Sequence, residues 1–134
     1  MIEYVLDTDT CIYWLKGEEK VRKKVEKVGA DNLRMTIITL AELKYGAYYS
    51  QKVNENLENI FKFLRKVKVL SLDYDAVERF GKIKAELRRS GQIIQDFDIL
   101  IASITLSHTG VLVTNNVEHF KRIPGLSYEN WLQE

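Results

Sequence analysis

Short apolar runs alternate with segments of helical periodicity along the whole chain, and this alternation is the strongest constraint on the fold. The apolar runs have the length and residue types of buried strands, and one or two helical segments separate each from the next. Such an order favours an α/β fold, with a parallel sheet covered by helices on both faces. Strands are predicted at residues 2–7, 33–38, 67–72 and 111–114, helices at about 10–16, 18–28, 39–49, 54–66, 74–89 and 96–108, and a last short element ends at Trp131.

The length and composition agree with one folded unit. The chain has 134 residues, 46% of them apolar, so residues 1–134 are expected to form a single domain with a substantial core. The 20 basic and 19 acidic residues nearly cancel, so the net charge of +1 indicates no class of partner. The only cysteine, Cys11, is interpreted as a small buried residue in a reducing compartment. Neither a signal peptide nor an apolar run of membrane-spanning length is evident, so we expect a cytoplasmic protein.

The position of Asp7 gives the first functional hypothesis. Asp7 directly follows the first predicted strand, and the carboxyl ends of parallel strands form the edge of a sheet where ligands bind. The structural alternative is an Asp that caps the next helix. Asp9 and Thr10 are better placed for that role, so Asp7 is predicted to be functional and Asp9 to be a cap or a supporting group.

Two interpretations are open for Glu42. In the first, Glu42 joins Asp7 at the sheet edge. In the second, Thr39 is the N-cap of the next helix and Glu42, three residues later, completes a capping box. Both keep the carboxylate ionised, because an acid in the first turn interacts with the positive end of the helix dipole.

Asp96 and Asp98 open a strongly apolar helix. Asp96 is interpreted as the N-cap, which leaves Asp98 in the first turn. A carboxylate on a packed helix face needs a partner, and a metal ion is a good one, so Asp98 is preferred over Asp96 as a metal ligand. The helix face that carries Asp98 is small and apolar, with Ile101, Ala102 and Thr105 at helical spacing.

Carboxylates gathered at one sheet edge repel one another and raise each other's pKa values. A hard cation removes this penalty, and Mg²⁺ or Mn²⁺ prefers oxygen ligands, so a metal-dependent site that handles phosphate is the leading hypothesis. After the last strand, Thr114, Asn115 and Asn116 either form a simple turn or orient waters or a phosphate. No zinc spacing, glycine-rich phosphate loop or nucleophile with an evident base is present.

The same residues carry a family resemblance over nearly the whole chain. The sequence resembles PIN-domain proteins, and in particular the VapC-type toxin ribonucleases of toxin–antitoxin systems. The matching stretches are Leu6-Asp7-Thr8-Asp9, the run from Ile38 through Glu42 to Gly46, the run from Asp98 to Ala102, the run from Leu112 to Asn116, the ending from Phe120 to Leu126, and Asn130-Trp131.

The resemblance implies a three-layer fold with a parallel sheet of about four to five strands. It implies Mg²⁺ or Mn²⁺ held by Asp7 and Asp98 with a contribution from Glu42, and endonucleolytic cleavage of RNA by a metal-activated water. Asn116 and His119 stand where relatives often carry acids, and Asp9 stands where Asn is more usual. The polar residues expected around the three acids are Thr8, Asp96, Thr114 and Asn116.

The resemblance also implies protein partners, namely a second copy of the chain and a cognate antitoxin whose tail blocks the site. Several basic clusters and three tyrosines are candidates for RNA contact, although solvated helix faces and packing explain them equally well. The clusters are 20–27, 62–68, 82–89 and 121–122, and the tyrosines are Tyr45, Tyr48 and Tyr49.

Two other functions are considered. The segment from Val5 to Thr10 also resembles the first motif of haloacid-dehalogenase-type phosphatases, in which the first Asp attacks phosphate. The order of the later motifs argues against that assignment. The second alternative is a PIN-like module that binds RNA or protein without cleaving anything.

Overall fold

The computed structural model describes residues 1–133, and within them the strands form one parallel sheet. The sheet order is β3-β2-β1-β4-β5, and every pairing between neighbours is parallel. This confirms the predicted α/β class and the predicted sheet. The strands are β1 (Tyr4–Leu6), β2 (Leu33–Thr36), β3 (Lys68–Leu70), β4 (Val111–Val113) and β5 (Ser127–Glu129).

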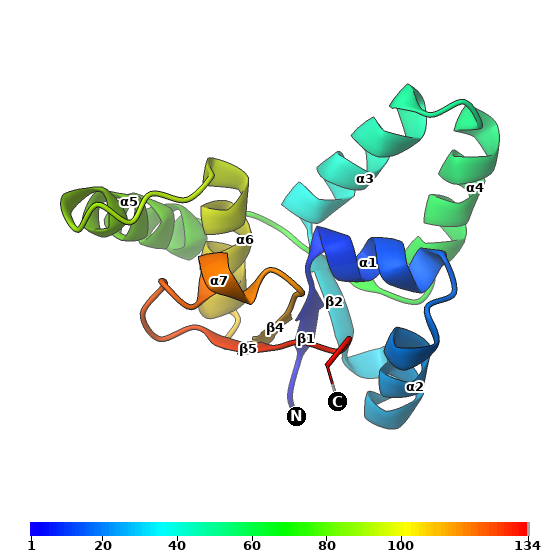
Figure 1. The fold of residues 1–134 in the computed structure, drawn as a ribbon, viewed down its shortest axis with the longest axis horizontal. Helices are drawn as coiled ribbons and strands as arrows, with labels where there is room; N and C mark the ends of the chain where they lie inside the picture. The colour runs from blue at the N-terminus through cyan, green and yellow to red at the C-terminus, as the bar shows by residue number, and fades with distance from the viewer. Residues whose placement is uncertain (134) are drawn as a thin grey trace.

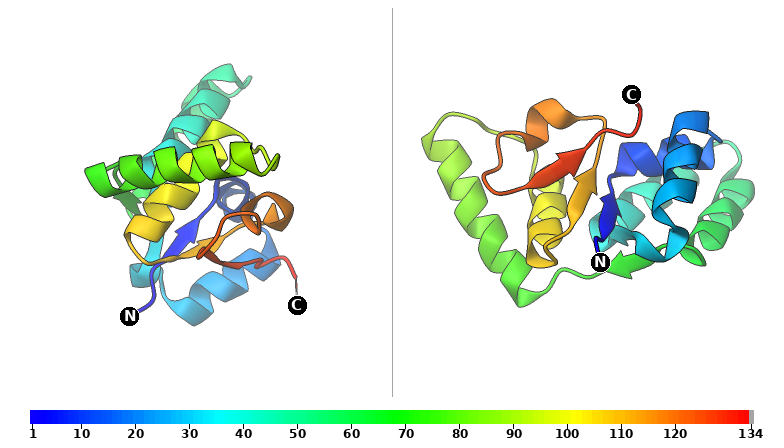
Figure 2. Two further views of the ribbon diagram at one scale, coloured as in Figure 1. Left: turned by 90° about the vertical axis from the view of Figure 1, so that its left-hand side faces the viewer. Right: turned by 90° about the horizontal axis from the view of Figure 1, so that it is seen from below.

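Helices cover both faces of the sheet. Figures 1 and 2 show α5, α6 and α7 on one side of the strands and α1 to α4 on the other. The result is the expected three-layer arrangement. The α-helices are α1 (Thr8–Leu15), α2 (Glu19–Val28), α3 (Ile37–Tyr49), α4 (Val53–Leu64), α5 (Tyr74–Arg89), α6 (Asp96–Ser107) and α7 (Val117–Phe120).

The alternation of side chains along the central strands creates two cores. Val5 of β1 and Leu112 of β4 pack into the core under α5 and α6, whereas Leu6 and Val113 pack into the core under α1 to α4. Adjacent residues of a strand point to opposite faces, so each of these short strands contributes to both layers. Cys11 lies fully buried in the second core, as predicted.

The strand order places a crevice at the carboxyl end of the sheet. From β1 the chain passes to β2 and β3 on one side, and it then returns to place β4 on the other side of β1. The connections that leave β1 and β4 therefore diverge, and in open α/β sheets ligands bind at such a point. Asp7 and Thr114 follow these two strands directly.

Several element boundaries differ from the sequence-based prediction. Helix α3 begins at Ile37 rather than at residue 39, and α1 begins at Thr8 rather than near residue 10. The 3₁₀ turn Ala30–Asn32 and the one-turn helix α7 were not predicted, because segments of three or four residues carry no usable periodicity. Within residues 1–133 no helix is long and apolar enough to cross a membrane.

Candidate active site

Asp7 lies at the end of β1 and is almost completely buried, with 6% of its surface exposed. Its Oδ1 atom accepts a hydrogen bond from the Thr8 N–H at 2.8 Å, and its Oδ2 atom accepts one from the Thr114 hydroxyl at 2.8 Å. Asp7 is thus the N-cap of α1 as well as the central acid of the site. The prediction that Asp9 or Thr10 would cap this helix was wrong, because the helix begins two residues earlier.

Burial raises the pKa of Asp7 to about 7, and the charge of Asp9 and, to a smaller extent, that of Asp98 add to the shift. The hydrogen bonds from Thr114 and Thr8 act in the opposite direction. Burial also raises the pKa of Asp9, with a further contribution from Asp98. The three acids therefore interact through space, and no cationic side chain is among the groups that shift the pKa values of Asp7 and Asp9.

Glu42 reaches the same region from α3. The N-cap of this helix is Thr36, whose hydroxyl accepts the Thr39 N–H at 3.1 Å. Thr39 is therefore inside the helix, and the capping-box interpretation of Glu42 was wrong. Instead, Glu42 accepts a hydrogen bond from the Thr8 hydroxyl at 2.7 Å. Because Thr8 adjoins Asp7, this bond brings Glu42 to the start of α1.

Asp98 lies in the first turn of α6, as predicted, with 18% of its side chain exposed. Its Oδ2 atom lies 3.0 Å from Nδ1 of His119, and the same Nδ1 lies 2.8 Å from Nδ2 of Asn116. One ring nitrogen either donates to Asp98 or accepts from Asn116, so the protonation of His119 decides which contact is a hydrogen bond. His119 was not among the predicted site residues, although the family resemblance had already aligned it with a position where relatives often carry an acid.

Asp96 is directed elsewhere. The N-cap of α6 is Gln95, and Asp96 lies inside the helix, so its prediction as the cap was wrong. Its carboxylate forms an ion pair with Nζ of Lys84 on α5 at 2.8 Å, and 55% of its side chain is exposed. A solvated pair with Lys84 distinguishes Asp96 from Asp98, which faces the site.

The polar turn after β4 supports the acids. The Thr114 hydroxyl donates to Asp7 and accepts the Asn116 N–H at 2.9 Å, and the Thr114 side chain is fully buried. The Asn115 N–H donates to Oδ2 of Asp9 at 3.0 Å, which ties the turn to α1. The segment is therefore a turn, and its Thr114 hydroxyl orients Asp7. Its predicted role in orienting waters or a phosphate stays a prediction.

The donor chemistry fits a hard divalent cation. The site supplies carboxylate oxygens, and the buried Asp7 faces other acids without a compensating cation among its charged neighbours. In the described residues, however, no three His, Cys, Asp or Glu side chains already form a metal-binding cluster. The hydrogen bond from Thr8 to Glu42 and the contact of His119 with Asp98 hold these two acids in their present positions.

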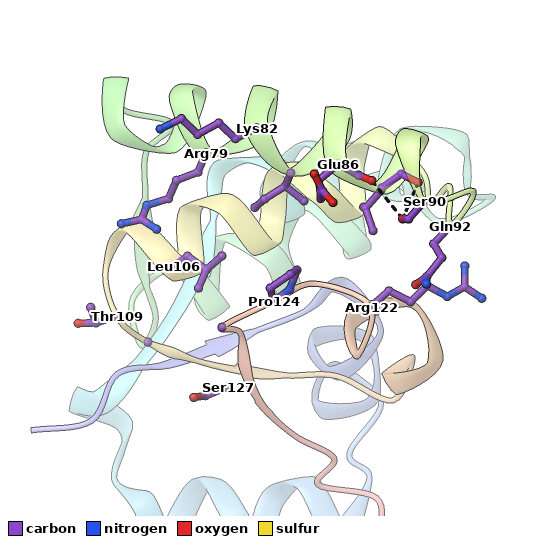
Figure 3. Close-up of a pocket in the computed structure, with 14 residues that line it drawn as sticks. Arg79, Lys82, Glu86, Ser90, Gln92, Leu106, Thr109, Arg122, Pro124 and Ser127 are labelled. Atoms are coloured by element: carbon purple, nitrogen blue, oxygen red, sulfur yellow. Dashed lines mark hydrogen bonds between the residues drawn. The ribbon is translucent and has the colours of Figure 1, made fainter.

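Two cavities lie near these elements. A groove of about 340 Å³ between α1, α3 and α4 has Glu42 in its wall together with Ile12, Leu15 and Ile60. Figure 3 shows another cavity, of about 760 Å³, between α5 and the loop that carries Arg122 and Pro124. None of the three candidate acids lines this second cavity, so the cavity is not part of the candidate active site.

Comparisons with known proteins agree with the fold. The family model described as "PIN domain" matches residues 4–126. The chain is 35% identical over 130 residues to ribonuclease VapC2 of Rickettsia felis, covering 96% of this chain and 97% of that protein. It is 36% identical over 131 residues to the tRNA(fMet)-specific endonuclease VapC of Salmonella typhimurium, covering 98% of this chain and 99% of that protein.

The solved structures similar to this one include complexes of such proteins. VapBC2 of Rickettsia felis bound to a promoter DNA fragment gives a TM-score of 0.91 at 36% identity, covering 98% of this chain and 99% of that chain. DNA-bound VapBC of Salmonella typhimurium gives a TM-score of 0.92 at 37% identity, with the same coverage. A family match over most of the chain and full-length relatives above 30% identity lead to one assignment: the chain belongs to the PIN-domain family, in its VapC branch.

Proposed function

We propose that the protein is the toxin of a type II toxin–antitoxin system and that it is an endoribonuclease dependent on Mg²⁺ or Mn²⁺. The observation that carries the proposal is the buried Asp7 at the end of β1, whose pKa is raised in part by the charge of Asp98 on α6. Glu42 of α3 accepts a hydrogen bond from Thr8, which adjoins Asp7. The names of the full-length relatives, which are ribonucleases and endonucleases, support the proposal.

Each acid has a defined role in this proposal. Asp7 and Asp98 would hold the cation, and Glu42 would act as a further ligand or as the base that orients the attacking water. The bound cation would supply Lewis-acid activation of water and stabilisation of charge at the scissile phosphate. Thr114 keeps Oδ2 of Asp7 in place, and Thr8 keeps the carboxylate of Glu42 facing the first strand. Both hydroxyls therefore limit the rotation of an acid on which the chemistry depends.

The substrate proposed first is an initiator tRNA. Relatives from Salmonella typhimurium and Shigella flexneri carry the name tRNA(fMet)-specific endonuclease, at 36% and 35% identity over 131 residues. Since RNA is the proposed substrate, the cytoplasm is the proposed place of action.

The proposed partners are a VapB-like antitoxin and a second copy of the chain. The similar structures from Rickettsia felis and Salmonella typhimurium are VapBC complexes, which supports an antitoxin partner for this chain. The groove beside Glu42 combines apolar walls with direct access to a site acid. An antitoxin tail that occupied this groove would also cover the acid, so binding and inhibition would coincide.

The proposal is tested by incubating purified, antitoxin-free protein with total RNA and with initiator tRNA. We expect discrete fragments with Mg²⁺, none with EDTA, and none with Asp98→Asn. Asp31→Asn is the matched control, because Asp31 is exposed on the 3₁₀ turn at the opposite end of β2. Cleavage that persists in Asp98→Asn, or that survives EDTA, would contradict the assigned site.

The two alternative functions give different outcomes in the same assays. A folded protein that binds RNA but leaves it intact in Mg²⁺ would be a binding module. Trapping of a phospho-aspartate would indicate the phosphatase. The PIN-domain match covers residues 4–126 and therefore includes the segment from Val5 to Thr10, on which the phosphatase interpretation was based.

A further inference from the structure

Two exposed tyrosines form a preorganised aromatic stack on α3. The rings of Tyr45 and Tyr49 have centroids 5.8 Å apart and planes 13° apart. They are among the most exposed large side chains of the molecule, with 68% and 81% of their surface accessible. Neither ring contributes to the two cores, so packing within this chain does not account for the pair.

The stack continues the helix face that carries Glu42. At about 100° per residue, Tyr49 lies about 20° and Tyr45 about 60° from the direction of Glu42. Their Cα atoms follow that of Glu42 by about 10.5 Å and about 4.5 Å along the helix axis. The opposite face of α3, with Leu43 and Ala47, is buried in the second core. An exposed aromatic surface therefore extends along α3 from Glu42 toward the end of the helix.

The electrostatics of this end of the sheet limit how a nucleic acid can be held there. The charge of Asp98 acts on both Asp7 and Asp9, and no Lys or Arg side chain is among the groups that shift the pKa values of those two acids. The basic side chain found in contact with Asp98 is His119, at 3.0 Å. The carboxylates therefore contribute no attraction for the RNA backbone before a metal is bound, so binding in its absence depends on other contacts. Aromatic faces are neutral, and stacking on them binds any unpaired base without contact to phosphate.

We propose that the Tyr45–Tyr49 stack is a platform on which unpaired bases of the substrate RNA lie while the adjoining backbone enters the site at Glu42. The proposal rests on the proposed ribonuclease function and names the form of RNA that the site takes, namely a single-stranded loop or end. The alignment with Glu42 favours RNA over a second protein copy. A base bound on this face would keep its phosphate beside the carboxylates.

The test measures binding separately from cleavage. In EDTA, the anisotropy of a fluorescein-labelled, random-sequence, single-stranded RNA pool of about 12 nucleotides reports the Kd, and the matched duplex serves as comparison. We expect the double variant Tyr45→Ala/Tyr49→Ala to weaken single-strand binding roughly 10-fold or more. Tyr45→Phe/Tyr49→Phe should stay within about twofold of the wild type, because the rings remain. Tyr48→Ala is the matched control, since Tyr48 is 65% exposed on the same helix but outside the stack.

Three results would overturn the proposal. They are a wild-type protein that does not bind the single-stranded pool, an alanine double variant that binds like the wild type, and an equal loss in Tyr48→Ala. Light scattering on the same samples adds a fourth: a double variant with a changed oligomeric state would assign the rings to a subunit contact instead. Failure of the ribonuclease proposal is distinguishable, because it shows as intact RNA in Mg²⁺ while ring-dependent binding in EDTA persists.

Discussion

Replacing Asp7 by Asn should make the metal-free protein more stable at alkaline pH, although Asp7 is the central acid of the site. The pKa of Asp7 rises from its ordinary value of 3.8 to about 7 in the folded protein, a difference of 7 − 3.8, or about 3 units. At about 1.4 kcal/mol per unit, ionising this buried carboxyl group costs the folded state up to about 4 kcal/mol. Asn has the same shape and can still accept the Thr8 N–H, so the variant removes the charge and keeps the cap.

The sign follows from linkage between protonation and folding. The folded-state pKa lies above the unfolded one, so the contribution of Asp7 to stability is full below about pH 4 and is lost as pH rises to about 7. In EDTA, Asp7→Asn and the wild type should melt at similar temperatures near pH 4. At pH 8 the variant should melt higher by roughly 5–15 °C.

Thermal unfolding followed by circular dichroism measures the difference, with Asp31→Asn as the control for loss of one exposed charge. Adding Mg²⁺ at pH 8 should raise the melting temperature of the wild type and leave that of Asp7→Asn unchanged, because the cation stabilises only a state that binds it. A variant less stable than the wild type at pH 8 in EDTA would refute the reasoning. A difference that does not change with pH would refute it as well.

Three further predictions concern the same site. The affinity for Mn²⁺, measured by titration calorimetry, should fall about tenfold per pH unit below about pH 7 and be constant above it. The reason is that the metal must displace the proton of Asp7. An affinity that does not change with pH would exclude Asp7 as a ligand. Thr114→Val removes the donor to Asp7 and the acceptor of the Asn116 N–H. The substitution should slow cleavage about 10- to 100-fold and lower the free energy of unfolding in urea by about 1–3 kcal/mol. Unchanged cleavage would mean that the reaction does not need the Thr114 hydroxyl to orient Asp7. Lys84→Met breaks the exposed pair with Asp96 and removes the Lys84 ammonium 5.8 Å from the centre of the Phe80 ring. Stability should change by less than about 1 kcal/mol and cleavage by less than about twofold. A large loss of cleavage would instead indicate that Asp96 takes part in the site.

The sequence was sufficient for the layers of the fold and for the places of Asp7 and Asp98, at the end of β1 and in the first turn of α6. Alternating apolar runs and helical periodicity are local signals, so the parallel sheet and its covering helices could be predicted without knowledge of contacts. Asp98 was placed correctly in the first turn of its helix, because the apolar face that begins there is itself a local pattern.

The start of α3 was the clearest failure of local reasoning. Ile37 and Ile38 are β-branched and continue the apolar run of β2, so the sequence pattern extends the strand into what is the first turn of the helix. The boundary is set by the Thr36 side chain, which caps the helix through the Thr39 N–H. The role of Glu42 depended on that boundary, because an acid in the second turn cannot complete a capping box.

Contacts between distant residues could not be predicted in this way. His119 meets Asp98 across 21 residues of chain, and the Thr8 hydroxyl meets Glu42 across 34. Both contacts depend on how helices pack over the sheet, and a single sequence carries no periodic signal for that packing.

The bond between Thr114 and Asp7 joins residues 107 positions apart, and this separation has a consequence during synthesis. At about 5–20 residues per second, the ribosome needs about 5–20 s after making the first strand to deliver the strand that completes its other side. Until then β1 lacks its β4 neighbour and Asp7 lacks the Thr114 hydroxyl that orients it. The carboxylate centre is therefore assembled only when nearly all of the chain has been translated, so a nascent chain carries no formed centre.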